Sequence, residues 1–134
     1  MVGETIMSEA IVLLAHGARD PEWARPIEAI AARLRNLLPD TQIAISYLEL
    51  MHPDIDTAVI TLVERGARRV RVVPVFLAQG GHVKRDLPEK VDALRAKLVL
   101  AHADLRIDLE TAIGEQLEII DAIAACISRN TSKR

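Results

Sequence analysis

The amino-acid sequence predicts a single α/β domain with a four-stranded parallel sheet flanked by helices, in the order βαβαβαβα. Short apolar runs alternate with segments of helical periodicity, which is typical of parallel strands joined by helical crossovers. The chain has 134 residues, 50% hydrophobic but only 2% aromatic, so small aliphatic side chains must fill one core. We expect the domain over residues 10–128, a flexible N-terminal extension over 1–9 and a polar tail over 129–134.

The first half of the chain supplies two strands and the helix between them. The apolar run 10–15 predicts a buried strand that ends at the His-Gly pair 16–17. The Asp-Pro pair 20–21 then gives an N-cap and a first-turn proline to a helix that runs to about Leu38. Residues 42–48 form the second predicted strand, because an apolar segment follows a break at proline.

A second helix and a third strand follow. Pro53 and the acidic residues after it predict the start of the helix, since carboxylates are favourable at the positive end of its dipole. Gly66 is the expected C-cap. The valine-rich segment 70–75 predicts the third strand, and Pro74 should lie near its end because proline cannot donate a ladder hydrogen bond.

The last part of the chain completes the alternation. Residues 78–87 are expected to form a loop, and Pro88 to open a helix. A weaker strand is predicted at 105–109. Gly114 then precedes a final amphipathic helix over 115–127.

Charge, the length of the apolar runs and cysteine usage exclude several kinds of partner and indicate the cellular environment. The formal charge is −2, so the chain lacks the basic surface that nucleic acids require. The early apolar run 10–15 is far shorter than the roughly 20 residues that cross a membrane. The single cysteine, Cys126, has no partner for an internal disulfide and is expected on the core side of the final helix. We therefore expect no nucleic acid, no membrane and a reducing, cytoplasmic environment.

Phosphate chemistry is disfavoured as well. The sequence contains neither a phosphate-binding loop ending in Lys-Ser or Lys-Thr nor a G-x-G-x-x-G motif after the first strand. His16 and Gly17 after a first strand also fit a phosphohydrolase. That chemistry needs an arginine directly before the histidine, and Ala15 occupies the position.

Three residues are the candidate catalytic groups because each follows a predicted strand. In an open α/β sheet, ligands bind beyond the carboxyl ends of the strands. His16, Glu49 and His82 follow the first, second and third strands, so we expect them at one edge. Imidazole binds divalent transition metals and accepts protons near neutral pH. The sequence therefore predicts metal binding by His16 and His82.

The loops around these residues suggest a flat, anionic ligand. Glycines allow the backbone to approach a planar molecule, and cationic side chains attract negative charge. The candidate substrate-binding residues are Gly17, Arg19, Gln79, Gly80, Gly81, Lys84 and Arg85.

Each of these interpretations has a structural alternative. Glu49 is equally a catalytic carboxylate or a surface charge, and the glycines at 80–81 could serve only as a turn. The cations could be merely solvated. Asp20 and Asp86 are best explained as caps of the helices that follow them. Two histidines are interpreted as surface or hydrogen-bonded residues: His52 and His102.

Two stretches of the chain resemble a known family. Residues 14–21 (LAHGARDP) and 73–88 (VPVFLAQGGHVKRDLP) are similar to the two signature stretches of the sirohydrochlorin chelatase family, of the CbiX and SirB type. Between them, Glu49 followed by Pro53 resembles the family's acidic residue before its second helix. The resemblance covers about residues 10–127, with the elements in the same order.

The resemblance implies a chelatase-like fold and a lyase that inserts Co²⁺, Fe²⁺ or Ni²⁺ into sirohydrochlorin or a related tetrapyrrole, in cobalamin or sirohaem biosynthesis. His16 and His82 would present the ion or accept pyrrole protons, and Glu49 would relay protons or orient a histidine. The cations would hold peripheral carboxylates of the ring. The metal ion is then a substrate, and no permanently bound cofactor is expected.

The resemblance also implies an assembly. Longer family members contain two such units, so a single-unit chain is expected to pair as a homodimer. One departure is Ala18, where the family usually has serine after His-Gly. A competing interpretation is a tetrapyrrole or metal carrier that binds without turnover.

Overall fold

The computed structural model describes residues 8–132, so most of the predicted N-terminal extension lies outside the described part. The strands are β1 (Glu9–Ala15), β2 (Gln42–Tyr47), β3 (Arg69–Pro74) and β4 (Arg106–Leu109). The helices are α1 (Arg25–Leu37), α2 (Ile55–Glu64), α3 (Gly81–Val99) and α4 (Leu117–Ser132), with 3-10 turns η3 (Pro21–Ala24) and η4 (Ile113–Glu115).

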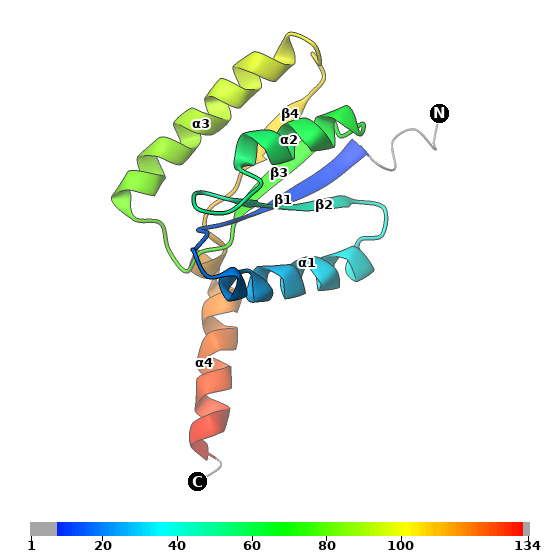
Figure 1. The fold of residues 1–134 in the computed structure, drawn as a ribbon. Helices are drawn as coiled ribbons and strands as arrows, with labels where there is room; N and C mark the ends of the chain where they lie inside the picture. Colours follow the sequence, from blue (N-terminus) through cyan, green and yellow to red (C-terminus); the bar gives the residue numbers. More distant parts are fainter. Residues whose placement is uncertain (1–7, 133–134) are drawn as a thin grey trace.

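All strands pair in parallel in the order β2-β1-β3-β4, which confirms the predicted sheet (Figure 1). β1 lies inside the sheet between β2 and β3. Its residues Val12 and Leu14 are completely buried, as expected for a strand covered on both faces. The order also places the carboxyl ends of β2, β1 and β3 side by side.

Helices cover the two faces unequally. α2 and α3 pack on one face, where Val12, Val59, Val72 and Val91 share one core cluster. α1 packs on the other face, over β1 and β2, in a smaller cluster that includes Ile27. No described helix is both long enough and apolar enough to span a membrane.

Helix ends follow the predicted local signals. The Asp20 side chain accepts a hydrogen bond from the Glu22 backbone at 2.9 Å, and Asp54 accepts one from the Thr57 backbone at 2.9 Å. Gly66 has a φ of 103° just after α2, the conformation expected at a glycine C-cap.

The predicted start of α3 is wrong. We expected a loop over 78–87 and a helix from Pro88, but α3 begins at Gly81 and contains Pro88 internally. Leu87 is only 2% exposed and Val83 packs against the same core, so the apolar stripe begins before the proline. Burial of this first part of the helix offsets the hydrogen bond that proline cannot donate.

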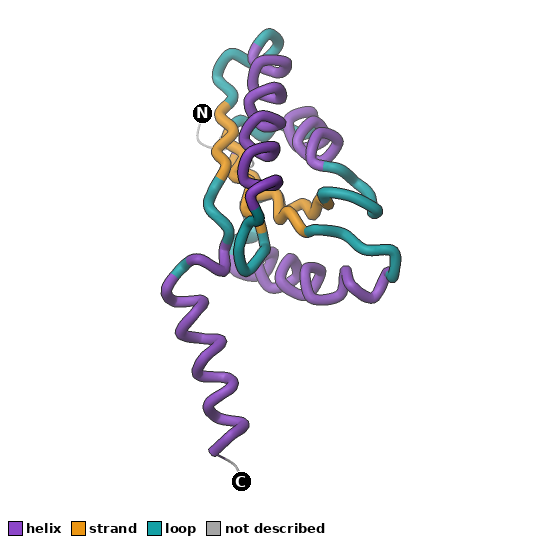
Figure 2. The backbone as a smooth tube through the Cα atoms, turned by 90° about the vertical axis from the view of Figure 1, so that its left-hand side faces the viewer, coloured by secondary structure: helices purple, strands orange, loops and turns teal. Residues whose placement is uncertain are grey.

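The final helix differs more strongly from expectation. α4 continues to Ser132, through most of the segment expected to be a tail, and projects away from the sheet (Figure 2). Cys126 is exposed, so its predicted place on the core side is wrong. Helical periodicity shows that α4 has an apolar face, but it does not show which surface covers that face.

Candidate active site at the carboxyl edge of the sheet

The three candidate catalytic residues leave adjacent strands at one edge. His16 directly follows β1, Glu49 lies two residues beyond β2, and His82 is in the first turn of α3, beyond β3. The backbone N–H of Glu49 donates to the carbonyl of His16 at 3.1 Å. The loops after β1 and β2 are therefore held together next to the site.

Gly17 makes this close approach possible. Its φ is 91°, and a Cβ at this position would lie 1.9 Å from the carbonyl oxygen of Glu49. Gly17 was expected to make room for a flat ligand. In the structure, the atom nearest to a Cβ built on Gly17 is the backbone carbonyl oxygen of Glu49, so the absence of a side chain lets the loops after β1 and β2 pack together.

The imidazole of His16 stacks on Phe76, the residue that continues the path of β3. The ring centroids are 4.2 Å apart and the planes are tilted by 30°. Phe76 is buried, whereas His16 is exposed. A fixed ring beneath it restricts the orientation of the His16 imidazole and leaves its other side accessible.

His82 has a charged partner on its own helix. Its Nε2 lies 2.8 Å from Oδ2 of Asp86, one helical turn later. The imidazole is 84% exposed. Asp86 was interpreted as a cap for a helix at Pro88, and that interpretation is wrong because both residues lie inside α3. The contact instead favours one orientation of the His82 imidazole.

Two small cavities border the site. Glu49, His82 and Asp86 line one of about 220 Å³, together with Lys90. His16 lines another of about 220 Å³ beside α1. The two imidazoles thus border different cavities, and Glu49 lines the cavity of His82 while its backbone is hydrogen-bonded to His16. Within residues 8–132, no cluster of three or more His, Cys, Asp or Glu side chains forms a ready metal site.

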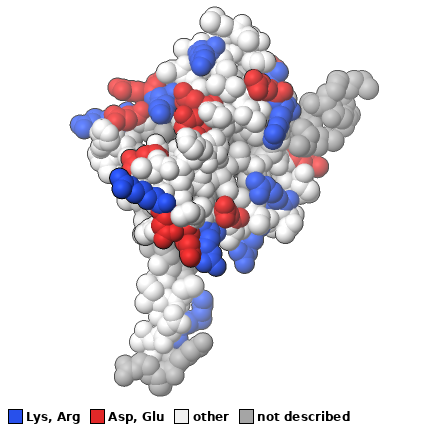
Figure 3. Space-filling model, in the orientation of Figure 1, with Lys and Arg blue, Asp and Glu red and all other residues white. Residues whose placement is uncertain are grey.

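The three predicted cations lie close in the chain to His16 and His82. Arg19, Lys84 and Arg85 are exposed, and none of them forms an ion pair within the described residues. Gln79 is half-buried, and no atom lies within 4 Å of a Cβ built on Gly80 or Gly81, so the space over these glycines is open. Over the face shown in Figure 3, charges of both signs are interspersed.

A buried tyrosine borders the candidate site. Tyr47 ends β2, is 7% exposed and lines the cavity that contains His16. Burial and the nearby carboxylate of Glu28 raise the pKa of Tyr47 above its ordinary value. Its hydroxyl therefore keeps its proton over the physiological range and is a hydrogen-bond donor.

Four residues that border the candidate site were not predicted as site residues: Tyr47, Phe76, Asp86 and Lys90. The spacing of His82 and Asp86 is the i,i+4 pattern of a helical pair, and a correct helix start would have revealed it. Phe76 lies within the second signature stretch, residues 73–88. No feature of the neighbouring sequence indicates that its ring contacts the His16 imidazole.

Comparison with known proteins agrees with this architecture. The family model named CbiX matches residues 10–130. A sirohydrochlorin cobaltochelatase of Methanocaldococcus jannaschii is 43% identical over 82 residues, 60% of this chain and 56% of that protein. A protein of the same name from Sulfolobus acidocaldarius is 36% identical over 68% of this chain and 74% of its own length. The match to the first of these relatives thus spans little more than half of it.

Solved structures of CbiX and SirB proteins are also similar to this chain. A putative cobalamin biosynthesis CbiX protein of Marinobacter aquaeolei superposes with a TM-score of 0.79 at 31% identity, covering 94% of this chain and 99% of that one. The sirohydrochlorin chelatase SirB of Bacillus subtilis, in complex with cobalt, superposes with a TM-score of 0.72 at 28% identity, over 92% of this chain and 51% of its own. Because the family model matches nearly the whole chain and the sheet has the parallel four-stranded order described above, the chain belongs to the CbiX family.

Proposed function

We propose that this protein inserts Co²⁺, Fe²⁺ or Ni²⁺ into sirohydrochlorin or a related tetrapyrrole, in cobalamin or sirohaem biosynthesis. One observation carries the proposal: in a chain of the CbiX family, His16, Glu49 and His82 leave three adjacent parallel strands at their carboxyl edge. Relatives named sirohydrochlorin cobaltochelatase and ferrochelatase support the choice of reaction. The metal ion is a substrate in this scheme, and the protein needs no permanent cofactor.

Metal insertion requires proton acceptors. The ring must lose its two inner N–H protons, and the ion must exchange water for ring nitrogens. If the Nε2–H of neutral His82 donates to Asp86, the exposed Nδ1 has a free lone pair for the ion or a proton. After His82 takes up a proton, the carboxylate of Asp86 stabilises the imidazolium. Asp86 thus acts as a positioning residue through His82.

His16 and Glu49 complete the proton path. Phe76 holds the His16 ring from one side, so its accessible side is the one that meets a planar substrate. Glu49 lines the cavity of His82 and is bonded through its backbone to His16. We assign Glu49 the role of passing protons from the histidines to solvent, for which its exposure is suitable.

The substrate is held mainly by charge. Sirohydrochlorin carries carboxylates around its rim, and Arg19, Lys84 and Arg85 are exposed cations next to the site. Gly17, Gln79, Gly80 and Gly81 supply the backbone surface against which the ring would lie. We further propose a cytoplasmic homodimer, because a single open edge encloses a macrocycle poorly.

The direct test is an anaerobic insertion assay with Fe²⁺, Co²⁺ and Ni²⁺ in parallel. General-base help is worth about 10² to 10⁴ in rate, so His16→Ala and His82→Ala should each lower kcat by about that factor. His102→Ala is the matched control, because His102 is far from this edge in the fold and should leave kcat unchanged. Near-normal turnover by both site variants would overturn the assignment. Binding of the ring without any metallated product would instead identify a carrier.

Asp86 is tested separately from the catalytic histidines. Asp86→Asn should lower kcat while leaving KM nearly unchanged, because it acts on a histidine and not on the ring. Asp86→Glu should restore part of kcat, since it keeps the carboxylate. Glu89→Gln removes another exposed carboxylate of α3 and is the control. A KM effect without a kcat effect would show that Asp86 touches the substrate instead.

A further inference from the structure

The loop after β2 contains a strained residue next to a candidate catalytic group. Leu50 directly follows Glu49, and its φ is 68°. Within residues 8–132, it is the only residue other than glycine with a positive φ. This left-handed conformation is unfavourable for leucine because the side chain crowds the backbone. Strained residues of this kind persist where the surrounding structure holds them, and they are concentrated at binding and catalytic sites.

Backbone hydrogen bonds hold Leu50 in this conformation. The N–H of Met51 donates to the carbonyl of Glu49 at 2.8 Å, which closes a γ-turn with Leu50 at its centre. The N–H of Tyr47 donates to the carbonyl of Pro53 at 3.0 Å and closes the base of the same loop. Glu49 is itself bonded to the loop after β1, as described above. Leu50 therefore lies at the tip of a loop whose position relative to the site is fixed.

The turn presents an apolar side chain at the surface. Leu50 is 58% exposed. It lines a cavity of about 360 Å³ together with Ala18, Arg19 and His52, which we call the Leu50 cavity. Ala18 is the position at which the family usually has serine, so a methyl group lies here in place of a hydroxyl. The cavity thus combines an apolar wall with the positive charge of Arg19.

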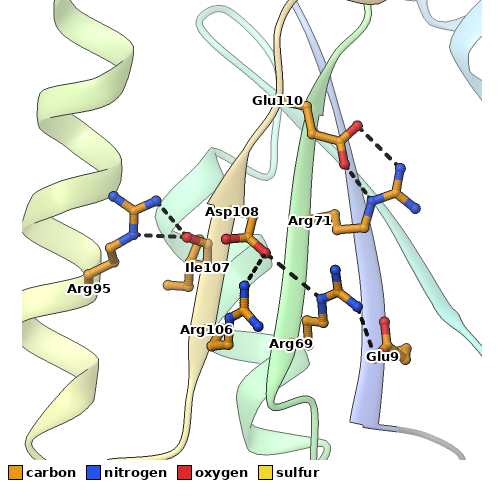
Figure 4. A network of polar contacts seen from close by, with 8 residues as sticks. All are labelled: Glu9, Arg69, Arg71, Arg95, Arg106, Ile107, Asp108 and Glu110. Carbon is orange, nitrogen blue, oxygen red and sulfur yellow. Dashed lines mark hydrogen bonds and ion pairs between the residues drawn. The ribbon is translucent and has the colours of Figure 1, made fainter.

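Charged groups on another part of the sheet already bind one another. Across β1, β3 and β4, they form the ion pairs of Figure 4: Arg69 with Glu9 and Asp108, and Arg71 with Glu110. An anionic ligand at that surface would have to displace carboxylates. Arg19 forms no ion pair within the described residues. The Leu50 cavity is therefore better suited to a ligand that is apolar in its centre and anionic at its rim.

We propose that Leu50 is a ring-contact residue, an inference that rests on the proposed function. Its side chain packs against one face of the tetrapyrrole, and Arg19 in the same cavity binds a carboxylate at the rim of the ring. The contact is apolar, because covering leucine removes hydrocarbon surface from water. The γ-turn holds the side chain in place before the ring arrives, so little conformational freedom is lost on binding. The strain at Leu50 is then a consequence of its role in binding.

The first experiment titrates the metal-free, full-length protein with sirohydrochlorin and follows the absorption of the ring. Leu50→Asn replaces the apolar side chain with a polar one and should weaken binding by about tenfold or more. Leu50→Met keeps an apolar side chain of similar size and should bind as the wild type does. Wild-type affinity in Leu50→Asn would overturn the proposal.

The matched control for this titration is Leu100→Asn. Leu100 is 89% exposed and lies between α3 and β4, away from the carboxyl edge of the sheet. Removing this exposed leucine should leave the affinity for sirohydrochlorin unchanged. If both asparagine variants lost affinity equally, the effect would not belong to the Leu50 cavity, and the ring contact would be excluded.

Thermal unfolding separates a role in binding from a role in folding. Asparagine adopts the left-handed conformation more readily than leucine, so Leu50→Asn should unfold at or above the wild-type temperature while binding the ring more weakly. This combination is the expected signature of strain retained for binding. A lower unfolding temperature together with weaker binding would identify Leu50 as a structural residue and overturn the proposal.

Salt dependence distinguishes an apolar contact from a charged one. The ratio of wild-type to Leu50→Asn affinity should stay constant as the salt concentration rises, because the lost contact carries no charge. The loss caused by Arg19→Gln should shrink over the same range, since salt screens the attraction between exposed charges. A Leu50→Asn effect that also shrinks with salt would contradict an apolar contact.

Two further results distinguish this inference from its alternatives. Light scattering should give the same mass for Leu50→Asn and the wild type, and a changed mass would mean that Leu50 contacts another copy of the chain instead of the ring. If the wild type binds sirohydrochlorin and inserts no metal, while Leu50→Asn binds weakly, the proposed reaction fails and the ring contact stands. If the wild type inserts metal and Leu50→Asn binds equally tightly, the ring contact alone fails.

Discussion

Two apolar helices of this protein have opposite environments. α2 buries Ile55, Ala58, Val59, Leu62 and Val63 against the sheet. α4 is also amphipathic, yet all of its described residues are at least partly exposed. Both patterns predict a helix with an apolar face. The comparison shows that periodicity specifies that a face is to be buried, whereas connectivity determines which surface is within reach.

The two helices differ in how their ends are held. α2 joins β2 to β3, so both of its ends are tied to strands of one sheet. Asp54 caps its start and Gly66 its end. α4 follows the last strand and is tied only at its start, near Gly114. A helix that joins two strands of one sheet must return to that sheet, and within residues 8–132 no strand follows α4.

The largest effect that distinguishes α2 from α4 is expected from a substitution that creates a cavity beneath α2. Leu62 is 3% exposed, and Leu62→Ala should lower the free energy of unfolding by about 2–5 kcal/mol because it leaves a cavity in the core. Chemical denaturation measures the change. Ser128→Ala on the exposed α4 should change stability by less than about 0.5 kcal/mol. Equal effects of the two substitutions would contradict the described difference between the helices.

The next test concerns the loop that positions the site. Gly17→Ala should destabilise the protein by about 1–3 kcal/mol, because its Cβ would meet the Glu49 carbonyl oxygen at 1.9 Å in a left-handed conformation. Gly80→Ala is the matched control, since no atom lies within 4 Å of its Cβ and its φ is −69°. Thermal unfolding compares the two variants. A wild-type midpoint for Gly17→Ala would show that the loops are not packed in this way.

The smallest expected effect on stability comes from removing the N-terminal cap of α2, and its size depends on pH. Hydrogen bonds from Thr57 lower the pKa of Asp54 below its ordinary value. The carboxylate therefore contributes stability above the pKa of the unfolded state, about 3.9, and this contribution is lost as the pH falls through the lower folded pKa. Asp54→Ala should lower the free energy of unfolding by about 0.5–2 kcal/mol at pH 7.

The same measurement repeated at lower pH isolates the charge of the cap. The difference between wild type and Asp54→Ala should narrow below about pH 4, as the wild-type carboxyl becomes protonated. Asp54→Asn keeps the capping oxygen and is the control, because it should remain close to wild type at pH 7. If the difference in free energy of unfolding between wild type and Asp54→Ala stayed constant from pH 7 to below about pH 4, a charged cap would be excluded.

Local sequence signals predicted the sheet well. Apolar runs bounded by glycine, proline and acidic residues predicted the four strands in order, and short-range chemistry predicted the cap at Asp20 and the acidic helix start at Asp54. The start of α3 was missed because proline usually marks a helix start, while the burial of Leu87 that overrides it is a tertiary contact. The partner of His82 was missed for the same reason.

The amino-acid sequence by itself determined the order of strands and helices and the edge at which His16, Glu49 and His82 emerge, because these depend on periodicity and on residues close together in the chain. Only the tertiary structure decided that Phe76 lies against His16, that Gly17 meets the backbone of Glu49, and that α4 leaves the domain. These depend on distances between segments remote in sequence, which no local pattern encodes.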